Sequence, residues 1–178
     1  METAVFDSPV GKLHLAADEG GLCGLWLEGQ KYFAAGLTGT ETENPQNPAI
    51  RLAGEWLTAY FAGRRPEIAA LPLAPRGSTF RQRVWKLLCE IPYGEVTTYG
   101  ELAKRVAADM GRETMSAQAV GGAVGHNPIS VIIPCHRVVG ADGSLTGYAG
   151  GISKKLWLLR HEGADTVALY LPKSGTAL

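Results

Sequence analysis

The chain has 178 residues, of which 46% are apolar and 19% charged, and its formal net charge is +0. This composition fits one or two small globular domains. No apolar stretch is long enough to cross a membrane, and the first residues lack the basic and apolar segments of a secretion signal, so we expect a cytoplasmic protein with no membrane partner.

The charges are divided unevenly along the chain. Residues 1–75 hold five Lys/Arg and nine Asp/Glu, a net charge of −4, whereas residues 76–178 hold twelve and eight, a net charge of +4. This imbalance is compatible with a second half that faces nucleic acid, but an ordinary solvated surface accounts for it as well.

The first half of the chain reads as an antiparallel sheet with one helix. Alternating apolar residues predict three strands, "TAVFDS" at 3–8, "KLHLAAD" at 12–18 and "LCGLWLE" at 22–28. The polar stretch 37–48 has no periodicity and is expected to be a loop, and helical spacing of apolar residues follows over 49–63. Prolines in 64–78 then indicate a linker or crossing segment.

The second half reads as short helices with recognisable ends. Helices are predicted over 79–91, 99–110, 115–125 and 154–163. Thr79 with Gln82 and Thr98 with Glu101 form capping-box patterns, Ser153 is expected to cap the last helix, and Gly163 to end it.

The middle pair of helices forms a helix-turn-helix arrangement, and its second helix is rich in glycine. Gly121, Gly122 and Gly125 each cost about 1 kcal/mol relative to Ala inside a helix. Small residues let another backbone approach closely. That backbone is either a neighbouring helix or DNA, and the sequence leaves both readings open.

Three cysteines, Cys23, Cys89 and Cys135, form no CxxC pair and are expected to be free thiols. Cys23 and Cys89 have apolar surroundings typical of inert core thiols. Cys135 follows "SVIIP", which reads as a buried strand, and precedes His136 and Arg137, which are expected to lower its pKa.

Neighbours on an extended chain point to opposite faces, so His136 needs a turn or a bridging water to act on the thiol. The four histidines and three cysteines show no metal-ligand spacing, and we expect no metal and no cofactor. A cysteine hydrolase of small acyl substrates is one class that remains open.

The motif "IIPCHRVVG" resembles the active-site signature of the O6-alkylguanine-DNA alkyltransferases, the methylated-DNA-protein-cysteine methyltransferases. "IPYGEVTTYGELA", "AVGGAVGHNPISVIIPCHRVVGADGSLTGYAGG" and "KKLWLLRHEG" are similar to that family in the same order, over about residues 79–163. The likeness is nearest to the bacterial Ogt type, and the first half shares mainly its beginning, "FDSPVGKLHLAAD".

The resemblance implies an α+β protein of two domains. An RNase-H-like α/β domain with a small antiparallel sheet is expected over 1–75, and a helical domain with a winged-helix-like helix-turn-helix over 76–165. Residues 166–178 are expected to form a tail, disordered over "LPKSGTAL".

The implied activity is DNA repair by a single-turnover methyltransferase. Such a protein extrudes the damaged nucleotide from double-stranded DNA and moves the alkyl group of O6-alkylguanine onto its own cysteine, and the sequence leaves activity on O4-alkylthymine open. The thioether is stable, so each molecule reacts once, and a monomer without cofactor suffices. A non-reacting alkyltransferase-like lesion binder is an alternative that Cys135 argues against.

The family roles carry over to matching positions. Cys135 would be the nucleophile, His136 its base through a water, and Glu162 the group that orients His136. Tyr99 would bond the extruded guanine and help protonate it, and Asn127 would hold the turn before the active-site segment. The residues expected to form the substrate pocket are Tyr148, Val138, Ala149 and Gly147. The residues expected at the DNA are Gln118, Ser116, Ala119, Gly122 and Arg137.

Plain alternatives exist for three of these residues. Asn127 and Pro128 form a common turn dipeptide, Tyr99 could simply pack, and Glu162 could be a solvated helix end. One position departs from the family pattern. Gln118 stands where many members carry an arginine that fills the gap left by the flipped nucleotide, and it lacks the arginine's charge and planar fork.

Overall fold

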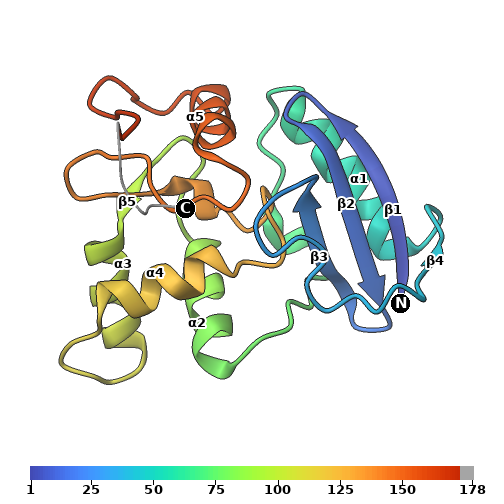
Figure 1. The fold of residues 1–178 in the computed structure, drawn as a ribbon, viewed down its shortest axis with the longest axis horizontal. Coiled ribbons are helices and arrows are strands. Elements are labelled where there is room, and N and C mark those ends of the chain that lie inside the picture. The colour runs from blue at the N-terminus through green and yellow to red at the C-terminus, as the bar shows by residue number, and fades with distance from the viewer. Residues whose placement is uncertain (173–178) are drawn as a thin grey trace. The chain divides into compact units, whose positions relative to one another are not determined.

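The computed structural model describes residues 1–172, and the chain is an α+β protein (Figure 1). It forms two compact units. The first unit comprises Met1–Arg76 and the short segment Pro128–Ile132. The second comprises Gly77–Asn127 and the described residues from Ile133 onward.

The first unit is a four-stranded sheet covered by one helix. The strands are β1 (Glu2–Ser8), β2 (Gly11–Asp18), β3 (Gly21–Leu27) and β4 (Thr42–Glu43), in the order β3-β2-β1-β4. The first three are antiparallel, as the alternation predicted, with Phe6 opposite Leu13 and Leu15 opposite Leu25. The expected loop proved to contain β4, which pairs in parallel with β1, so the sheet is mixed.

Helix α1 (Pro48–Phe61) begins where a proline and a cap coincide. Asn47 caps it by accepting from the amides of Ala49 and Ile50, and Pro48 occupies the first turn, where a missing N–H costs nothing. Its apolar side packs across β1, β2 and β3 (Figure 1). The crossing segment after it contains one turn of 3₁₀ helix, η1 (Ile68–Ala70).

Pro128–Ile132 joins the first unit along the free edge of β3. Leu25 N donates to Pro128 O at 2.8 Å, and Ser130 N donates to Leu25 O at 2.8 Å. Ser130 Oγ also lies 3.1 Å from Oε1 of the buried Gln30. A residue run far along the chain thereby completes the hydrogen bonding of an edge strand of the sheet.

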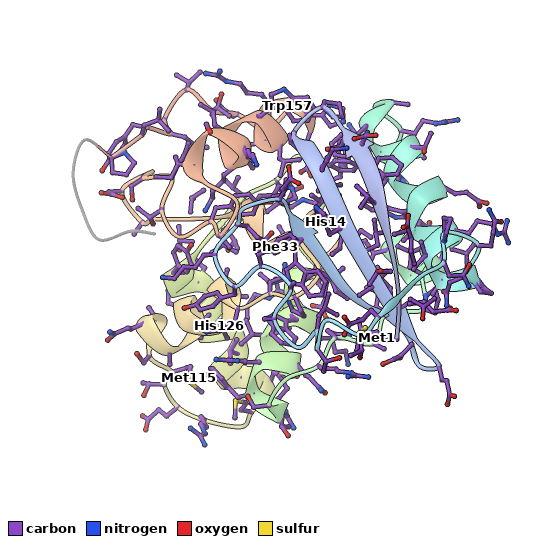
Figure 2. All side chains as sticks on the ribbon, turned by 45° about the vertical axis from the view of Figure 1, so that its right-hand side comes forward. Met1, His14, Phe33, Met115, His126 and Trp157 are labelled. Atoms are coloured by element: carbon purple, nitrogen blue, oxygen red, sulfur yellow. The ribbon has the colours of Figure 1, made fainter. Side chains whose placement is uncertain are left out.

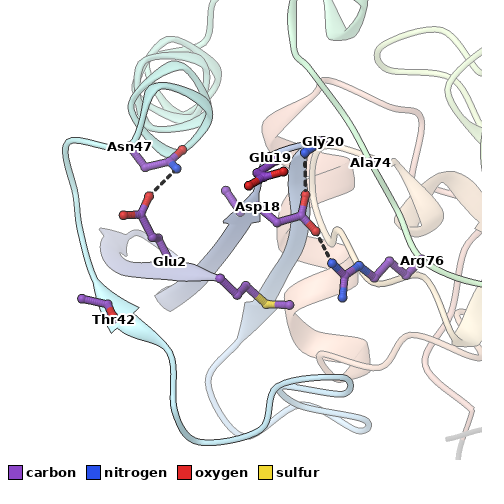
Figure 3. Close-up of a pocket in the computed structure, with 10 residues that line it drawn as sticks. Glu2, Asp18, Glu19, Gly20, Thr42, Asn47, Ala74 and Arg76 are labelled. Atoms are coloured by element: carbon purple, nitrogen blue, oxygen red, sulfur yellow. Dashed lines mark hydrogen bonds and ion pairs between the residues drawn. The ribbon is translucent and has the colours of Figure 1, made fainter.

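An open hollow of the first unit is lined by acidic groups that the fold already employs (Figure 3). Glu2 accepts from Asn47 Nδ2 at 2.6 Å, and Asp18 accepts from Gly20 N at 2.8 Å and pairs with Arg76. These carboxylates fasten the ends of β1 and β2 to the loops beside them.

The second unit is helical with a two-stranded parallel ribbon. Its elements are α2 (Thr79–Leu88), β5 (Thr97–Thr98), α3 (Tyr99–Asp109), α4 (Ala117–Gly125), η2 (Cys135–Arg137), β6 (Val138–Val139) and α5 (Ile152–His161). Trp85 of α2 donates its indole N–H to Ala123 O of α4 at 2.8 Å, which fixes these two helices together. Figure 2 labels Met115, two residues before α4 begins, and His126, the residue that caps its C-terminal end.

The helix ends agree with the sequence at some places and differ at others. Thr98 caps α3 by accepting from Glu101 N, and Gly163 has φ +74, so both predictions are confirmed. Thr79 is not a cap, since Ser78 accepts from Arg81 N instead. Ser153 is not a cap either, because α5 starts two residues earlier than predicted, behind Gly151, whose φ of +97 suits only glycine.

No helix between residues 1 and 172 is long and apolar enough to cross a membrane. Of the tail expected to be disordered, 171–178, the residues from 173 onward lie outside the described residues.

Candidate active site

The segment that carries Cys135 is buried but is not the strand that its apolar run predicted. Every residue from Val131 to Val139 is buried, yet only Val138 and Val139 are in a strand. Ile132 N donates to Ser130 O at 2.8 Å around Val131, which has φ +70, so this is a γ-turn of the rare strained kind. Cys135 N donates to Ile133 O at 2.8 Å around Pro134, which makes a second, relaxed γ-turn.

The two γ-turns explain the failed prediction. A β-branched residue at positive φ cannot continue a strand, and proline lacks the donor a strand needs. The chain turns twice and enters η2, so Cys135 sits on a tight bend, a place where backbone strain and function often coincide.

Cys135 is 6% exposed, and a side-chain amide contacts its thiol. Asn127 Nδ2 lies 3.1 Å from Cys135 Sγ and donates to Ile133 O at 2.8 Å, so one amide group holds both the bend and the sulfur. Burial raises the pKa of Cys135, and the Asn127 hydrogen bond and the charge of Lys155 offset this only in part. The expected lowering by His136 and Arg137 is therefore wrong, because burial dominates.

His136 is fully buried and paired with Glu162. His136 Nε2 lies 2.7 Å from Glu162 Oε1, so Nε2 carries the hydrogen and Nδ1 is left as an acceptor. Burial lowers the pKa of His136, and Glu162 offsets this only in part, so the ring is neutral near pH 7. Nδ1 is buried and bonds to no group in residues 1–172. The pair thus presents an unoccupied basic nitrogen.

Arg137 completes this pair from the other side. Its Nε and Nη2 donate to the two oxygens of Glu162 at 2.8 and 3.0 Å, and its Nη1 donates to Ile91 O at 2.6 Å. Burial alone would raise the pKa of Glu162, but the bonds and charges of His136 and Arg137 outweigh it, so this carboxyl is anionic. The structure corrects the expectation that Arg137 contacts DNA, because the side chain is buried and fully engaged inside the unit.

Lys155 is a buried cation that the sequence did not single out. It is completely buried in α5, and its ammonium group donates to Val138 O and, at 2.7 Å, to Thr146 O. Burial lowers the pKa of Lys155 to about 8. The local sequence gives only a weak sign of this burial, a lysine at an apolar-face position of "KKLWLL". The carbonyls that Lys155 binds lie outside its own helix.

Two tyrosines and a glycine stand beside the thiol segment. Tyr99 donates its hydroxyl hydrogen to Thr146 O at 2.9 Å, and Gly147, at φ +74, lies so close that a Cβ would be 2.5 Å from that hydroxyl. Tyr148 is 2% exposed, and its hydroxyl bonds to no group in the described chain. Ala149 is half-buried next to it. Burial raises the pKa of Tyr99 and of Tyr148, so both hydroxyls keep their hydrogens.

The exposed face of helix α4 carries mainly small residues. Ser116, Gln118, Ala119 and Gly122 are all exposed. A Cβ at Gly122 or Gly125 would meet nothing within 4 Å, whereas one at Gly121 would touch the Tyr99 ring at 3.7 Å. Packing within the unit accounts for Gly121 alone, which leaves two glycines free for an approaching backbone from outside.

Three other predictions concern thiols and metals. Cys23 is buried, with a pKa that burial raises, and Cys89 is half-buried, with a pKa that burial raises to about 11. No group of His, Cys, Asp and Glu side chains in residues 1–172 is arranged to hold a metal ion.

Known proteins match both halves of the chain. Residues 1–75 match the profile of the 6-O-methylguanine DNA methyltransferase ribonuclease-like domain, and residues 79–164 that of the DNA binding domain of the same family. A methylated-DNA–protein-cysteine methyltransferase of Methanosarcina acetivorans is 43% identical over 165 residues, 92% of this chain and 99% of that protein. One of Mycolicibacterium paratuberculosis is 46% identical over 162 residues, 91% of this chain and 92% of that protein.

Solved structures agree. Mycobacterium tuberculosis OGT in complex with DNA superposes with a TM-score of 0.78 at 42% identity, covering 95% of each chain. M. tuberculosis O6-methylguanine methyltransferase gives 0.76 at 44% identity, covering 90% of this chain and 92% of that one. The resemblance inferred from "IIPCHRVVG" is confirmed, and the chain belongs to the 6-O-methylguanine DNA methyltransferase family.

Proposed function

We propose that this protein repairs DNA by transferring the alkyl group of O6-alkylguanine to Cys135 in one irreversible reaction. The observation that carries the proposal is the arrangement around η2, where the thiol on a tight bend is contacted by Asn127 and the next residue is a neutral histidine with one unbonded nitrogen. A buried nucleophile beside a buried base fits a reaction that must exclude water from the reacting carbon.

The reaction balances with groups of this chain. The Cys135 thiol gives its proton to His136 Nδ1 through a bridging water, and Glu162 stabilises the imidazolium that forms. The thiolate sulfur then donates an electron pair to the alkyl carbon, the bond from that carbon to O6 breaks, and guanine takes the bonding pair. The proton held on His136 returns to the guanine anion. The product is a thioether that no group of the site can cleave.

Lys155 and Asn127 stabilise this thiolate inside the fold. Burial disfavours the charged sulfur, and the Asn127 amide and the Lys155 charge both act in the opposite direction. Tyr99, Tyr148, Ala149 and the backbone of Val138 form the wall against which we place the guanine. This wall and the thiol come from one chain, and we infer that a monomer acts alone, in the cytoplasm.

DNA reaches the site through α4 in this proposal. The exposed small residues let the helix approach a sugar-phosphate backbone closely, and a reaction on a single base requires that the base leave the stack. Ser116, Ala119 and Gly122 contact the backbone of the double helix, and Gln118 fills the gap that the guanine leaves.

Intact-mass measurement tests the proposal directly. The protein is mixed with a duplex oligonucleotide that contains one O6-methylguanine, and we expect the mass of one methyl group to be added to wild type and none to be added to Cys135→Ser. Cys89→Ser is the matched control, and it should take up one methyl group like wild type.

Each other outcome overturns the proposal in a distinct way. Tight binding of the lesion without any mass change indicates a non-reacting lesion binder, and repeated hydrolysis of small acyl esters indicates a cysteine hydrolase. Offering an O4-methylthymine duplex in the same assay tests the second lesion, which we expect to react through the same thiol.

Gln118 is tested by exchange in both directions. We expect Gln118→Ala to lower the methyl transfer rate and the affinity for duplex DNA, because the gap in the stack is left empty. Gln118→Arg should bind more tightly and with a steeper dependence on salt, since it adds a charge near the phosphates. Unchanged rate and affinity in Gln118→Ala would remove this residue from the mechanism.

A further inference from the structure

The residues after the matched family domain do not hang free. The DNA-binding domain of the family ends its match at residue 164, but Asp165–Leu171, here called the strap, folds back onto the loop Gly140–Gly150. Tyr170 N donates to Gly143 O at 3.1 Å, and Leu145 N donates to Tyr170 O at 3.0 Å. The strap therefore adds a strand-like pairing to a loop that otherwise lacks one.

The fit between strap and loop is close at two further points. Gly143 has φ +87, and a Cβ there would lie 2.3 Å from Ala168 O, so only glycine permits the strap to pass. Leu169 packs against the buried cluster of Val139, Leu145 and Leu159. The Tyr170 hydroxyl donates to Asp142 at the tip of the loop.

The same loop carries the wall of the candidate alkyl pocket on its other side. Thr146 O accepts hydrogen bonds from the Tyr99 hydroxyl and the Lys155 ammonium group. A Cβ at Gly147 would lie 2.5 Å from the Tyr99 hydroxyl. Tyr148 is buried beside His136, with the ring centroids 6.5 Å apart. Cys135 is only 6% exposed, so access to its thiol depends on the position of this wall.

We propose that the strap sets the width of the alkyl pocket by holding the loop Gly140–Gly150 against Tyr99, and so makes the site selective for small alkyl groups. The inference rests on the proposed function, because it assigns the strap to the same reaction. The strap does not touch the reacting atoms, and Tyr170 is accordingly a positioning residue.

Two truncated chains form the main test. One ends at Ala164 and lacks the strap, and the matched control ends at Pro172 and keeps it. Both react with duplexes that carry either O6-methylguanine or O6-benzylguanine. Without the strap we expect the methyl transfer rate to fall about tenfold, because a displaced wall no longer positions the small group. The benzyl-to-methyl rate ratio should rise, since the wider pocket admits the ring.

A point variant keeps the test valid if the shorter chain fails to fold. Tyr170→Pro removes the N–H that donates to Gly143 O. Val167→Ala is its control, because Val167 lies on the same strap and is 94% exposed. The affinity for unmodified duplex DNA should stay the same in all variants, since α4 is untouched. A merely structural role would lower the rates for both lesions equally and leave their ratio unchanged.

The outcomes separate the two ideas. If the full chain takes up no methyl group, the proposed function fails. If that chain reacts and neither the chain ending at Ala164 nor Tyr170→Pro alters the benzyl-to-methyl ratio, the role of the strap is overturned.

Discussion

Strand β3 and the active-site run Ile133–Val139 are both completely buried, but different groups satisfy their backbones. In β3 the backbone groups pair with β2 on one side and with Leu73 and Pro128–Ser130 on the other. In the active-site run, side chains share this role with a γ-turn and the pairing of β6 with β5, since Asn127 donates to Ile133 O and Lys155 donates to Val138 O.

The difference shows how the fold can bury polar side chains at all. A strand in a ladder needs no polar side chains, so its residues serve packing alone. A bent run leaves carbonyls open to side-chain donors, and these carbonyls become the partners that make a buried amide or ammonium tolerable. The irregular run therefore concentrates polar groups around Cys135, and the regular strand concentrates apolar ones.

Removing Glu162 is expected to destabilise the active-site run the most. Glu162→Ala leaves the buried Arg137 charge uncompensated and should lower the free energy of unfolding by about 3–5 kcal/mol. Leu25→Ala in β3 should cost about 2–5 kcal/mol through its cavity. Urea unfolding measures both losses, and methyl uptake per folded molecule should fall only in Glu162→Ala. Equal uptake in the two variants would contradict the distinction.

A second effect appears in the pH dependence of stability. The pKa of Lys155 is about 8 in the folded state and ordinary, near 10.5, in the unfolded state. Below pH 8 the fold carries the whole cost of burying the charge, and between about pH 8 and 10.5 the unfolded chain binds the extra proton. Stability should thus rise with pH in that window, by at most about 1.4 kcal/mol per pH unit.

Cys135→Ser is the suitable background for this measurement, because a raised thiol pKa acts with the opposite sign. Lys155→Met in that background should abolish the rise, and equal slopes with and without the lysine would show that its charge is not buried as described.

Asn127 gives a third, smaller effect. Asn127→Ala leaves Ile133 O without its side-chain donor and should cost about 1–3 kcal/mol in unfolding free energy. It should also raise the pKa of the Cys135 thiol further, because a hydrogen bond that favours the thiolate is lost. The rate of iodoacetamide labelling of Cys135 against pH reports that shift, and an unchanged profile would exclude the contact with the sulfur.

The smallest effect is expected at the thiol in the regular strand. Cys23 Sγ donates a hydrogen bond to Ala16 O at 3.4 Å. Cys23→Ala should change the unfolding free energy by about 1 kcal/mol and leave methyl uptake unchanged. A loss of uptake in this variant would break the separation between the two buried runs.

The sequence predicts the regular parts because their signals are local. The alternation around Leu13, Leu15 and Leu25 is visible within each strand, and so is the cap at Thr98. Strand β4 has two residues and no pattern of its own, because its pairing depends on β1, forty residues earlier.

The site is predictable only in part. Family resemblance supplied Cys135, His136 and Glu162, but Lys155 and the true position of Arg137 depend on carbonyls and carboxylates that the chain brings together only when folded. The apolar run "SVIIP" has the composition of a strand, and only the backbone conformation at Val131 shows that it is not one.

The hydrogen bond of the Tyr99 hydroxyl determines how this residue can interact with a bound guanine. Its single hydrogen is donated to Thr146 O, and burial raises the pKa of Tyr99, so the hydrogen stays on the hydroxyl oxygen. In this resting state the Tyr99 oxygen can only accept a hydrogen bond from a bound base. A guanine nitrogen that carries a hydrogen can donate to it directly, whereas a nitrogen without one can accept from Tyr99 only after the bond to Thr146 O breaks. Tyr99 thus distinguishes a protonated nitrogen from an unprotonated one before it can donate a proton.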